Sequence, residues 1–152
     1  MSSSARTAEP VDLRDELVID APAATVWALT IDIESWPQTT PTVTSVERLD
    51  DGPLAVGSRA RLKQPRQRAA VWTVTRLEPE TVFEWSTRTM GMTMTGGHRI
   101  EPLDDGRCRN VLTLRASGPT ATLLGWLVSR PIRQAIATEN AGIKRRAEAR
   151  RR

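Results

Sequence analysis

Turn-forming residues divide the middle of this chain into short segments and then cease. Asp50-Asp51-Gly52-Pro53, Glu78-Pro79-Glu80 and Gly118-Pro119 are three of the clusters that separate them. Short segments that alternate apolar and polar residues between such turns are typical of antiparallel strands. The pattern therefore predicts a meander of strands followed by one long element.

The apolar spacing assigns the segments individually. An opening strand is expected at Leu13–Ile19, and Pro22 suits the first turn of a following helix. Apolar residues from Val26 to Ile33 recur at helical spacing, and this helical stretch is expected to end near Trp36, because Pro37 disfavours helical geometry in the residue before it. Six further strands are expected at Thr42–Leu49, Ser58–Gln64, Ala69–Leu77, Thr81–Thr89, Met92–Glu101 and Arg107–Ala116.

The last element is expected to be one amphipathic helix from Thr120 to about Arg150, kinked at Pro131. A sheet with one apolar face needs a cover, and no other long amphipathic element is available. The predicted fold class is α+β: a curved antiparallel sheet of about seven strands wraps a long C-terminal helix, and two short helices follow the first strand. A gap between sheet and helix is the expected pocket.

The length of 152 residues favours one domain, which we expect over residues 11–152 after a disordered lead at 1–10. The net charge of +4 is concentrated in the last nine residues, where Lys144 to Arg146 and Arg150 to Arg152 face one acid, Glu148. The remainder is nearly neutral, so no nucleic-acid partner is expected. The basic tail either stabilises a helix C-terminus or binds an acidic surface such as a membrane.

Localisation is inferred from one cysteine and from the lack of a long apolar run. Cys108 has no partner for an intramolecular disulfide, which fits a reducing cytoplasm. The run Ala121–Val128 is too short to span a bilayer, so no stable membrane insertion is expected. The oligomeric state is left open, with a homodimer as one possibility.

Five stretches of the chain are distinctive: Val18–Trp27, Ile33–Pro37, Val56–Ser58, Trp72–Val74 with Phe83–Trp85, and Gly142–Glu148. Together they resemble the START-like superfamily, also called SRPBCC or the polyketide cyclase/dehydrase and lipid-transport group. The similarity covers about residues 11–150, and its opening stretch is the most specific. The resemblance implies a helix-grip fold with an internal cavity. It implies no single activity, since the superfamily includes lipid carriers, hormone receptors and aromatase/cyclases.

Strand alternation predicts which side chains face the gap. Methionine suits a pocket of variable shape, because its side chain is flexible and polarizable. The same methionines and tryptophans can instead fill a packed core, and both interpretations remain open. The predicted lining consists of Leu62, Gln64, Trp72, Phe83, Trp85, Met92, Met94, His98, Asn110 and Leu112 from the sheet, with Leu127, Ala135, Ile136, Glu139 and Ile143 from the helix.

His98 and Glu139 are the two inward-facing candidates for acid–base chemistry. His98 is the only histidine, so no multi-histidine metal site is possible, and we expect neither a metal nor a cofactor. Each candidate has a structural alternative: His98 as a hydrogen-bonded interior residue, and Glu139 as a partner of a nearby arginine.

Three functions are compatible with this pattern. The first is binding of a small hydrophobic, lipid- or polyketide-like molecule in the internal cavity. The second is an aromatase/cyclase or dehydratase acting on a ligand in the same cavity, which needs acid–base groups. The third is a protein-interaction module without a ligand. A binder should keep its ligand when His98 is replaced by alanine, whereas an enzyme should lose turnover.

Overall fold

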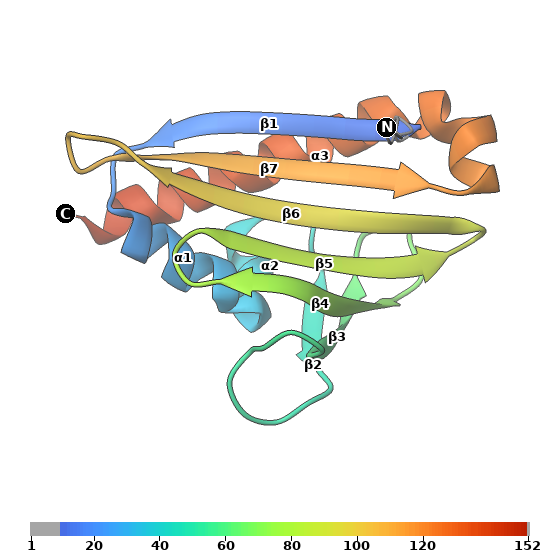
Figure 1. The fold of residues 1–152 in the computed structure, drawn as a ribbon, viewed down its shortest axis with the longest axis horizontal. Helices are drawn as coiled ribbons and strands as arrows, with labels where there is room; N and C mark the ends of the chain where they lie inside the picture. Colours follow the sequence, from blue (N-terminus) through green and yellow to red (C-terminus); the bar gives the residue numbers. More distant parts are fainter. Residues whose placement is uncertain (1–9, 152) are drawn as a thin grey trace, which may run out of the picture.

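A computed structural model describes residues 10–151, and in it the chain forms one curved sheet and one long helix (Figure 1). The seven strands are antiparallel, in the order β1-β7-β6-β5-β4-β3-β2. The predicted helix-grip fold is confirmed. Nearly all of the predicted lead at 1–10 lies outside the described residues. The elements are β1 (Val11–Ile19), α1 (Ala23–Ile31), η1 (Ile33–Ser35), α2 (Trp36–Thr39), β2 (Ser45–Arg48), β3 (Arg59–Lys63), β4 (Ala70–Glu78), β5 (Val82–Thr89), β6 (Met92–Pro102), β7 (Cys108–Ser117) and α3 (Pro119–Arg150).

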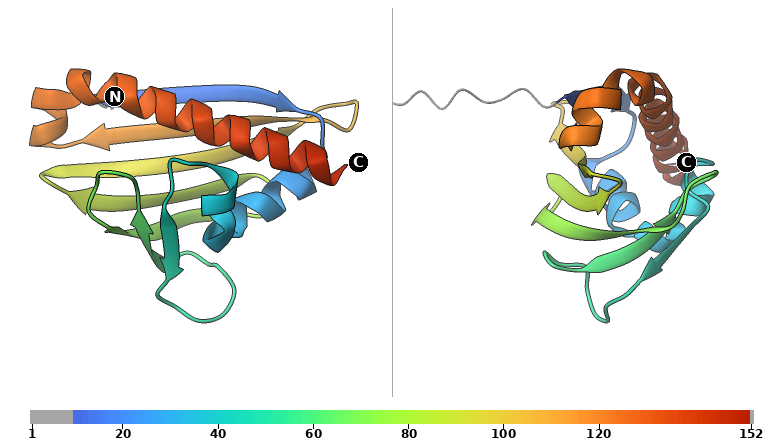
Figure 2. Two further views of the ribbon diagram at one scale, coloured as in Figure 1. Left: turned by 180° about the vertical axis from the view of Figure 1, so that it is seen from behind. Right: turned by 90° about the vertical axis from the view of Figure 1, so that its right-hand side faces the viewer.

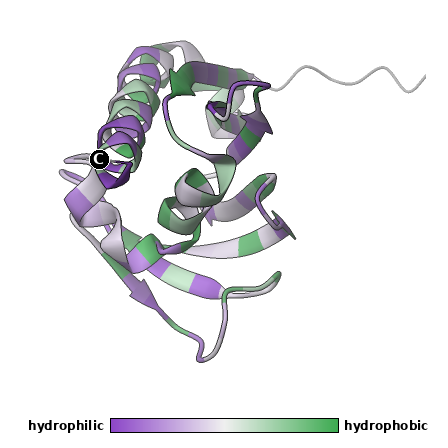
Figure 3. Ribbon diagram, turned by 90° about the vertical axis from the view of Figure 1, so that its left-hand side faces the viewer, coloured by the Kyte–Doolittle hydropathy of each residue, from purple (hydrophilic) through white to green (hydrophobic). Residues whose placement is uncertain are grey.

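The long helix lies across the concave side of the sheet (Figure 2) and packs chiefly on β1 and β7. The short helix α1 packs against both α3 and β6. Seen from the end where α3 terminates, the largely apolar α1 lies between α3 and the strands (Figure 3). The core therefore lies between one sheet face and the helices, as the alternation of apolar residues requires.

The prediction that the first helical stretch ends near Trp36 was wrong. The helix α1 ends at Ile31, and Trp36 instead begins α2 with helical angles (φ −56°, ψ −33°). Pro37 lies in the first turn of α2, where a backbone N–H has no intrahelical acceptor and proline is tolerated. The new helix directs Trp36 inward, and its indole Nε1 donates to the carbonyl oxygen of Thr30 at 3.2 Å.

The first turns of α3, drawn in orange, are bent away from the axis of the rest of the helix (Figure 2). Pro131 lies inside this helix, and a proline removes one backbone hydrogen bond and crowds the preceding turn. The bend carries the start of α3 around one end of the sheet. We call this the wide end: the first turns of α3, the β5–β6 turn and the β7–α3 turn meet there.

A buried amide cluster holds the middle of α3 to the sheet. The Asn140 side chain donates to a carboxylate oxygen of Asp15 on β1 at 2.9 Å. It accepts a hydrogen bond from the amide of Asn110 on β7, also at 2.9 Å. Asn110 and Asn140 are fully buried, so these bonds satisfy most of the polar groups that the two strands and the helix bring inside.

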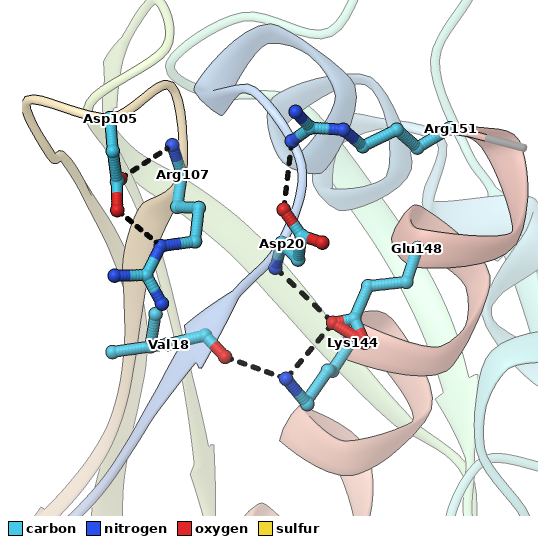
Figure 4. Close-up of polar contacts among 7 residues, drawn as sticks. All are labelled: Val18, Asp20, Asp105, Arg107, Lys144, Glu148 and Arg151. Carbon is cyan, nitrogen blue, oxygen red and sulfur yellow. Dashed lines mark hydrogen bonds and ion pairs between the residues drawn. The ribbon is translucent and has the colours of Figure 1, made fainter.

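Charged contacts hold the C-terminal half of α3 to the end of β1 (Figure 4). Lys144 Nζ donates to the carbonyl oxygen of Val18 at 2.8 Å and to Glu148 at 2.9 Å. Arg151 donates to Asp20 at 2.9 Å. On the other side of the helix, Arg146 donates to Thr39 of α2 at 2.7 Å. Much of the basic tail is thus engaged within the molecule, beside a helix C-terminus.

Candidate ligand-binding site

An aromatic cluster fills the interior beneath α2. Trp36 reaches down from α2 to Trp85 of β5, with ring centroids 5.1 Å apart. Trp85 in turn lies 5.3 Å from Trp72 of β4 and 5.3 Å from Phe83. The three sheet residues are at most 6% exposed. Edge-to-face and tilted rings at these separations are the arrangement aromatic side chains prefer in a core.

His98 completes this cluster from β6. Its ring centroid lies 5.5 Å from that of Trp36 and 5.7 Å from that of Phe83. Its Nδ1 is buried and has no hydrogen-bond partner in the described structure. Burial lowers the pKa of His98 to about 4. The imidazole is therefore neutral at pH 7.

Glu139 is half-buried on α3 and has one described hydrogen-bond partner, Thr42 of the loop before β2, whose hydroxyl donates to Oε1 at 3.0 Å. Burial raises the pKa of Glu139 to about 7, although the Thr42 hydrogen bond acts in the opposite direction. The arginine partner that the structural alternative supposes is not among its described contacts. At neutral pH the protonated and ionised forms of Glu139 are both populated, so the side chain can donate a proton or accept one.

The inner surface at the wide end is apolar but not sealed. Met92 and Met94 of β6 and Leu114 of β7 pack against the core, yet each remains partly exposed. Val128 and Ile132 of α3 likewise pack against the core and remain partly exposed. These five residues contrast with the aromatic cluster, whose sheet members are nearly inaccessible.

The other residues predicted as lining fall into several environments. Leu62, Leu112, Ile136 and Ile143 are buried, and Ala135 is half-buried. Gln64 lies just beyond the end of β3 and is half-buried. Asn110 belongs to the amide cluster under α3. Leu127 is 52% exposed, because it lies on the outer part of the bent α3 segment.

Sequence reasoning did not include Thr42, Asn140 or Arg48 in the site. Arg48 shares the inward parity of Val46 on β2, and this alternation was the available signal. Its Nη1 donates to the carbonyl oxygen of Gly52 at 2.6 Å, whereas Nε and Nη2 are buried without a partner in the described structure. The pairings of Thr42 and Asn140 join residues about one hundred positions apart, and no local pattern predicts them.

Shallow surface hollows of the described residues include two beside α3. One, of about 470 Å³, is formed by Ala141, Lys144, Arg145, Glu148 and Ala149 of α3. The other, of about 400 Å³, lies at the wide end, between the β5–β6 turn and the start of α3. Within residues 10–151 no group of three or more His, Cys, Asp or Glu side chains is placed to hold a metal ion. None of the described helices has the length and apolarity needed to cross a bilayer.

Solved structures share this fold at low sequence identity. A hypothetical protein from Helicobacter pylori superposes with a TM-score of 0.79 at 14% identity, covering 94% of this chain and 91% of that one. A protein from Thermus thermophilus gives a TM-score of 0.72 at 21% identity, with 91% and 97% covered. The Zhui aromatase/cyclase from Streptomyces sp. R1128 gives 0.71 at 23% identity, with 93% and 95% covered.

No match was found among curated proteins. A family model, however, matches residues 10–148, which is nearly the whole chain and includes the sheet, α1, α2 and almost all of α3. This agrees with the resemblance noted from the sequence. The chain belongs to the family described as polyketide cyclase / dehydrase and lipid transport.

Proposed function

We propose that this protein binds a small hydrophobic, lipid- or polyketide-like molecule between α3 and the wide end of the sheet. The observation that carries the proposal is the set of inward-facing apolar side chains that stay partly exposed: Met92, Met94, Leu114, Val128 and Ile132. When a ligand covers apolar surface that was in contact with water, the free energy of the system falls, which favours binding. The family description and the Zhui aromatase/cyclase fold support the same class of ligand.

The polar groups around this space suit a mostly apolar ligand that carries one or two oxygen functions. Glu139, with a pKa near 7, can donate to a carbonyl or accept from a hydroxyl. Gln64, half-buried at the end of β3, offers an amide. Small-molecule sites usually have mostly apolar walls and a small number of polar groups. The lone buried Cys108 favours a reducing compartment, so we assign the protein to the cytoplasm.

The proposal is tested by the binding of 1-anilinonaphthalene-8-sulfonate, a lipophilic dye, together with native mass spectrometry of the purified protein for retained lipophilic molecules. Met94→Trp should weaken dye binding at least about tenfold, because the larger ring occupies the space beside β6. Val56→Trp is the control, because Val56 is 62% exposed in the loop between β2 and β3. It should leave dye affinity within about twofold.

Equal dye binding by Met94→Trp and the wild type would place the dye elsewhere and overturn the assignment of the site. If the wild type bound no dye and retained no molecule, the protein-interaction alternative would replace ligand binding. Thermal unfolding of each variant verifies that a lost signal is not a lost fold.

Aromatase/cyclase or dehydratase chemistry on a ligand in the same space is the second candidate function. The observation that favours it is Glu139, whose pKa of about 7 suits a group that exchanges protons at neutral pH. In an intramolecular aldol condensation a base removes a C–H proton, the enolate carbon attacks a carbonyl to form the C–C bond, and an acid protonates the carbonyl oxygen to a hydroxyl. A base then removes a second C–H proton while that hydroxyl is protonated and leaves as water. His98, neutral at pH 7, is the second group available for such transfers.

This second function is tested with a poly-β-ketone thioester analogue. An enzyme should lose cyclisation in Glu139→Gln and His98→Ala, while both variants still bind the dye. A pure binder should show no cyclisation above the uncatalysed rate in the wild type. That result would exclude the catalytic alternative without affecting the binding proposal.

A further inference from the structure

The start of α3 exposes large apolar side chains to solvent. Trp126 is 76% exposed, Leu123 73% and Leu127 52%. Met90, in the β5–β6 turn at the same end of the molecule, is 82% exposed. Exposed aliphatic residues are common singly, but a group of this size on one helical segment marks an interaction surface. We call these four residues the apolar tip.

The apolar tip is held in place by the opposite face of the same helix. Gly125 lies against β1, where a Cβ atom would come within 2.9 Å of Val11 Cγ2 and 3.4 Å of the carbonyl oxygen of Pro10. This close approach directs the neighbouring Trp126 outward. A hollow of about 400 Å³ separates the β5–β6 turn from the start of α3 and includes Met90 and Pro119 in its wall.

The charged residues on the two segments that carry the apolar tip, the β5–β6 turn and the start of α3, are all positive. Residues 86–96 and 113–134, which run along this end of the molecule, contain no aspartate or glutamate. Arg88, Arg130 and Arg133 are exposed there. The nearest acid on β1, Asp12, lies opposite Arg115 in the strand register. At 3.6 residues per turn, Arg130 lies on the helical face of Trp126, and Arg133 follows just beyond Pro131.

We propose that the apolar tip docks on the surface of an anionic lipid bilayer. A helical segment with tryptophan and leucine beside arginines is suited to the bilayer interface, where aromatic rings lie at headgroup depth and cations meet anionic lipids. The arginines argue against a second copy as the occupant. In a two-fold dimer through this patch, Arg130 and Arg133 would face the same arginines of the other copy, and residues 119–134 of α3 carry no acid to offset them.

The docking is peripheral, since none of the described helices can cross a bilayer. It needs no ligand beneath α3, so it stands or falls independently of the proposed binding function. Because the tip adjoins the partly exposed inner surface at Met92, a docked molecule would hold that surface near the membrane.

Sedimentation of the full chain with vesicles tests this inference. One set is phosphatidylcholine alone, and the other contains about one third phosphatidylglycerol. We expect binding to the anionic vesicles, weakened by salt, with a blue shift of tryptophan emission and quenching by brominated lipid chains. Trp27, Trp72 and Trp85 are at most 9% exposed and Trp36 is half-buried, so Trp126 should carry this signal. Trp126→Phe should abolish the shift while vesicle binding persists.

Variants of exposed residues locate the surface without disturbing the fold. Leu123→Ser with Trp126→Ser, and separately Arg130→Glu with Arg133→Glu, should each weaken vesicle binding at least about tenfold. Val56→Ser is the apolar control, since Val56 is 62% exposed in the β2–β3 loop, away from α3. Arg145→Glu with Arg150→Glu is the charge control in the basic tail. Both controls should stay within about twofold of the wild type.

Three outcomes would overturn the inference. The first is an absence of binding to anionic vesicles. The second is loss of binding in the tail variant while the tip variants still bind, which would assign any membrane contact to the C-terminus. The third is a dimer by analytical ultracentrifugation that dissociates on Leu123→Ser with Trp126→Ser, in a protein that binds no vesicles.

Discussion

His98 is buried and Glu139 is half-buried, and burial shifts their pKa values in opposite directions. Loss of solvent disfavours the charged form of each group, so the pKa of His98 falls to about 4 and that of Glu139 rises to about 7. Each group therefore makes the stability of the fold depend on pH, with opposite slopes.

The slopes follow from the ordinary and folded pKa values. For Glu139, the unfolded chain releases its proton near pH 4.5 and the folded chain near 7, so stability falls as pH rises through that window. For His98, the unfolded chain gains a proton near pH 6.5 and the folded chain only near 4, so stability falls as pH drops through that window. The two effects oppose one another between about pH 4.5 and 6.5.

Glu139→Gln and His98→Phe should separate these effects in urea unfolding at a series of pH values. Relative to the wild type, Glu139→Gln should gain on the order of 2–3 kcal/mol between pH 4.5 and 8. His98→Phe should lose less stability than the wild type between pH 6.5 and 4. Glu34→Gln, an exposed position, serves as the control. If the free energy of unfolding depended on pH in the same way for the wild type and Glu139→Gln, the pKa of Glu139 would not be raised by folding, and the side chain would be well solvated.

The packing of α3 against α2 is close enough to require a glycine. A Cβ on Gly142 would fall onto the carbonyl oxygen of Thr39, a backbone atom that cannot turn away. Arg146, one turn further along α3, donates hydrogen bonds to Thr39 and Ser35. These bonds also hold α3 close to α2.

Gly142→Ala should therefore destabilise the protein by about 2 kcal/mol or more, measured by denaturant unfolding. In an ordinary helix interior the same change stabilises by about 1 kcal/mol. Ala141→Gly at the exposed neighbouring position measures that intrinsic preference and should cost about 1 kcal/mol. A Gly142→Ala variant more stable than the wild type would show that α2 and α3 are not in close contact.

At the scale of the whole molecule, α3 and the sheet share one core. The buried cluster includes residues of β1, α1, the sheet interior and α3, from Val11 to Ala147. No segment between residues 11 and 147 has a separate core that could stay folded after α3 detaches from the sheet. If residues 11–152 form a single domain, as predicted, the chain should unfold cooperatively.

Unfolding by urea should be a single transition, with near-ultraviolet dichroism from the aromatic cluster coinciding with far-ultraviolet dichroism from the backbone. The reason is that loss of α3 exposes the interior that the aromatic side chains share. Two separated transitions, with the aromatic signal lost at a different urea concentration, would contradict a single cooperative unit.

Local chemistry determined the order of the elements in this protein. Gly and Pro clusters mark the turns whatever lies beyond them, and the alternation of side chains along a strand predicts its inner face without its neighbours. The inner parity of Trp72, Phe83, Trp85 and His98 was accordingly visible in the sequence, as was the long amphipathic helix.

Tertiary structure alone decided how that interior is used. Trp36 joins the aromatic cluster because a new helix begins at this residue, and Thr42 contacts Glu139 across about one hundred residues. The raised pKa of Glu139 depends on what surrounds it, and the exposure of Trp126 depends on which face of α3 rests on β1. Burial is a property of packed neighbours rather than of residue order, so these features required the folded chain.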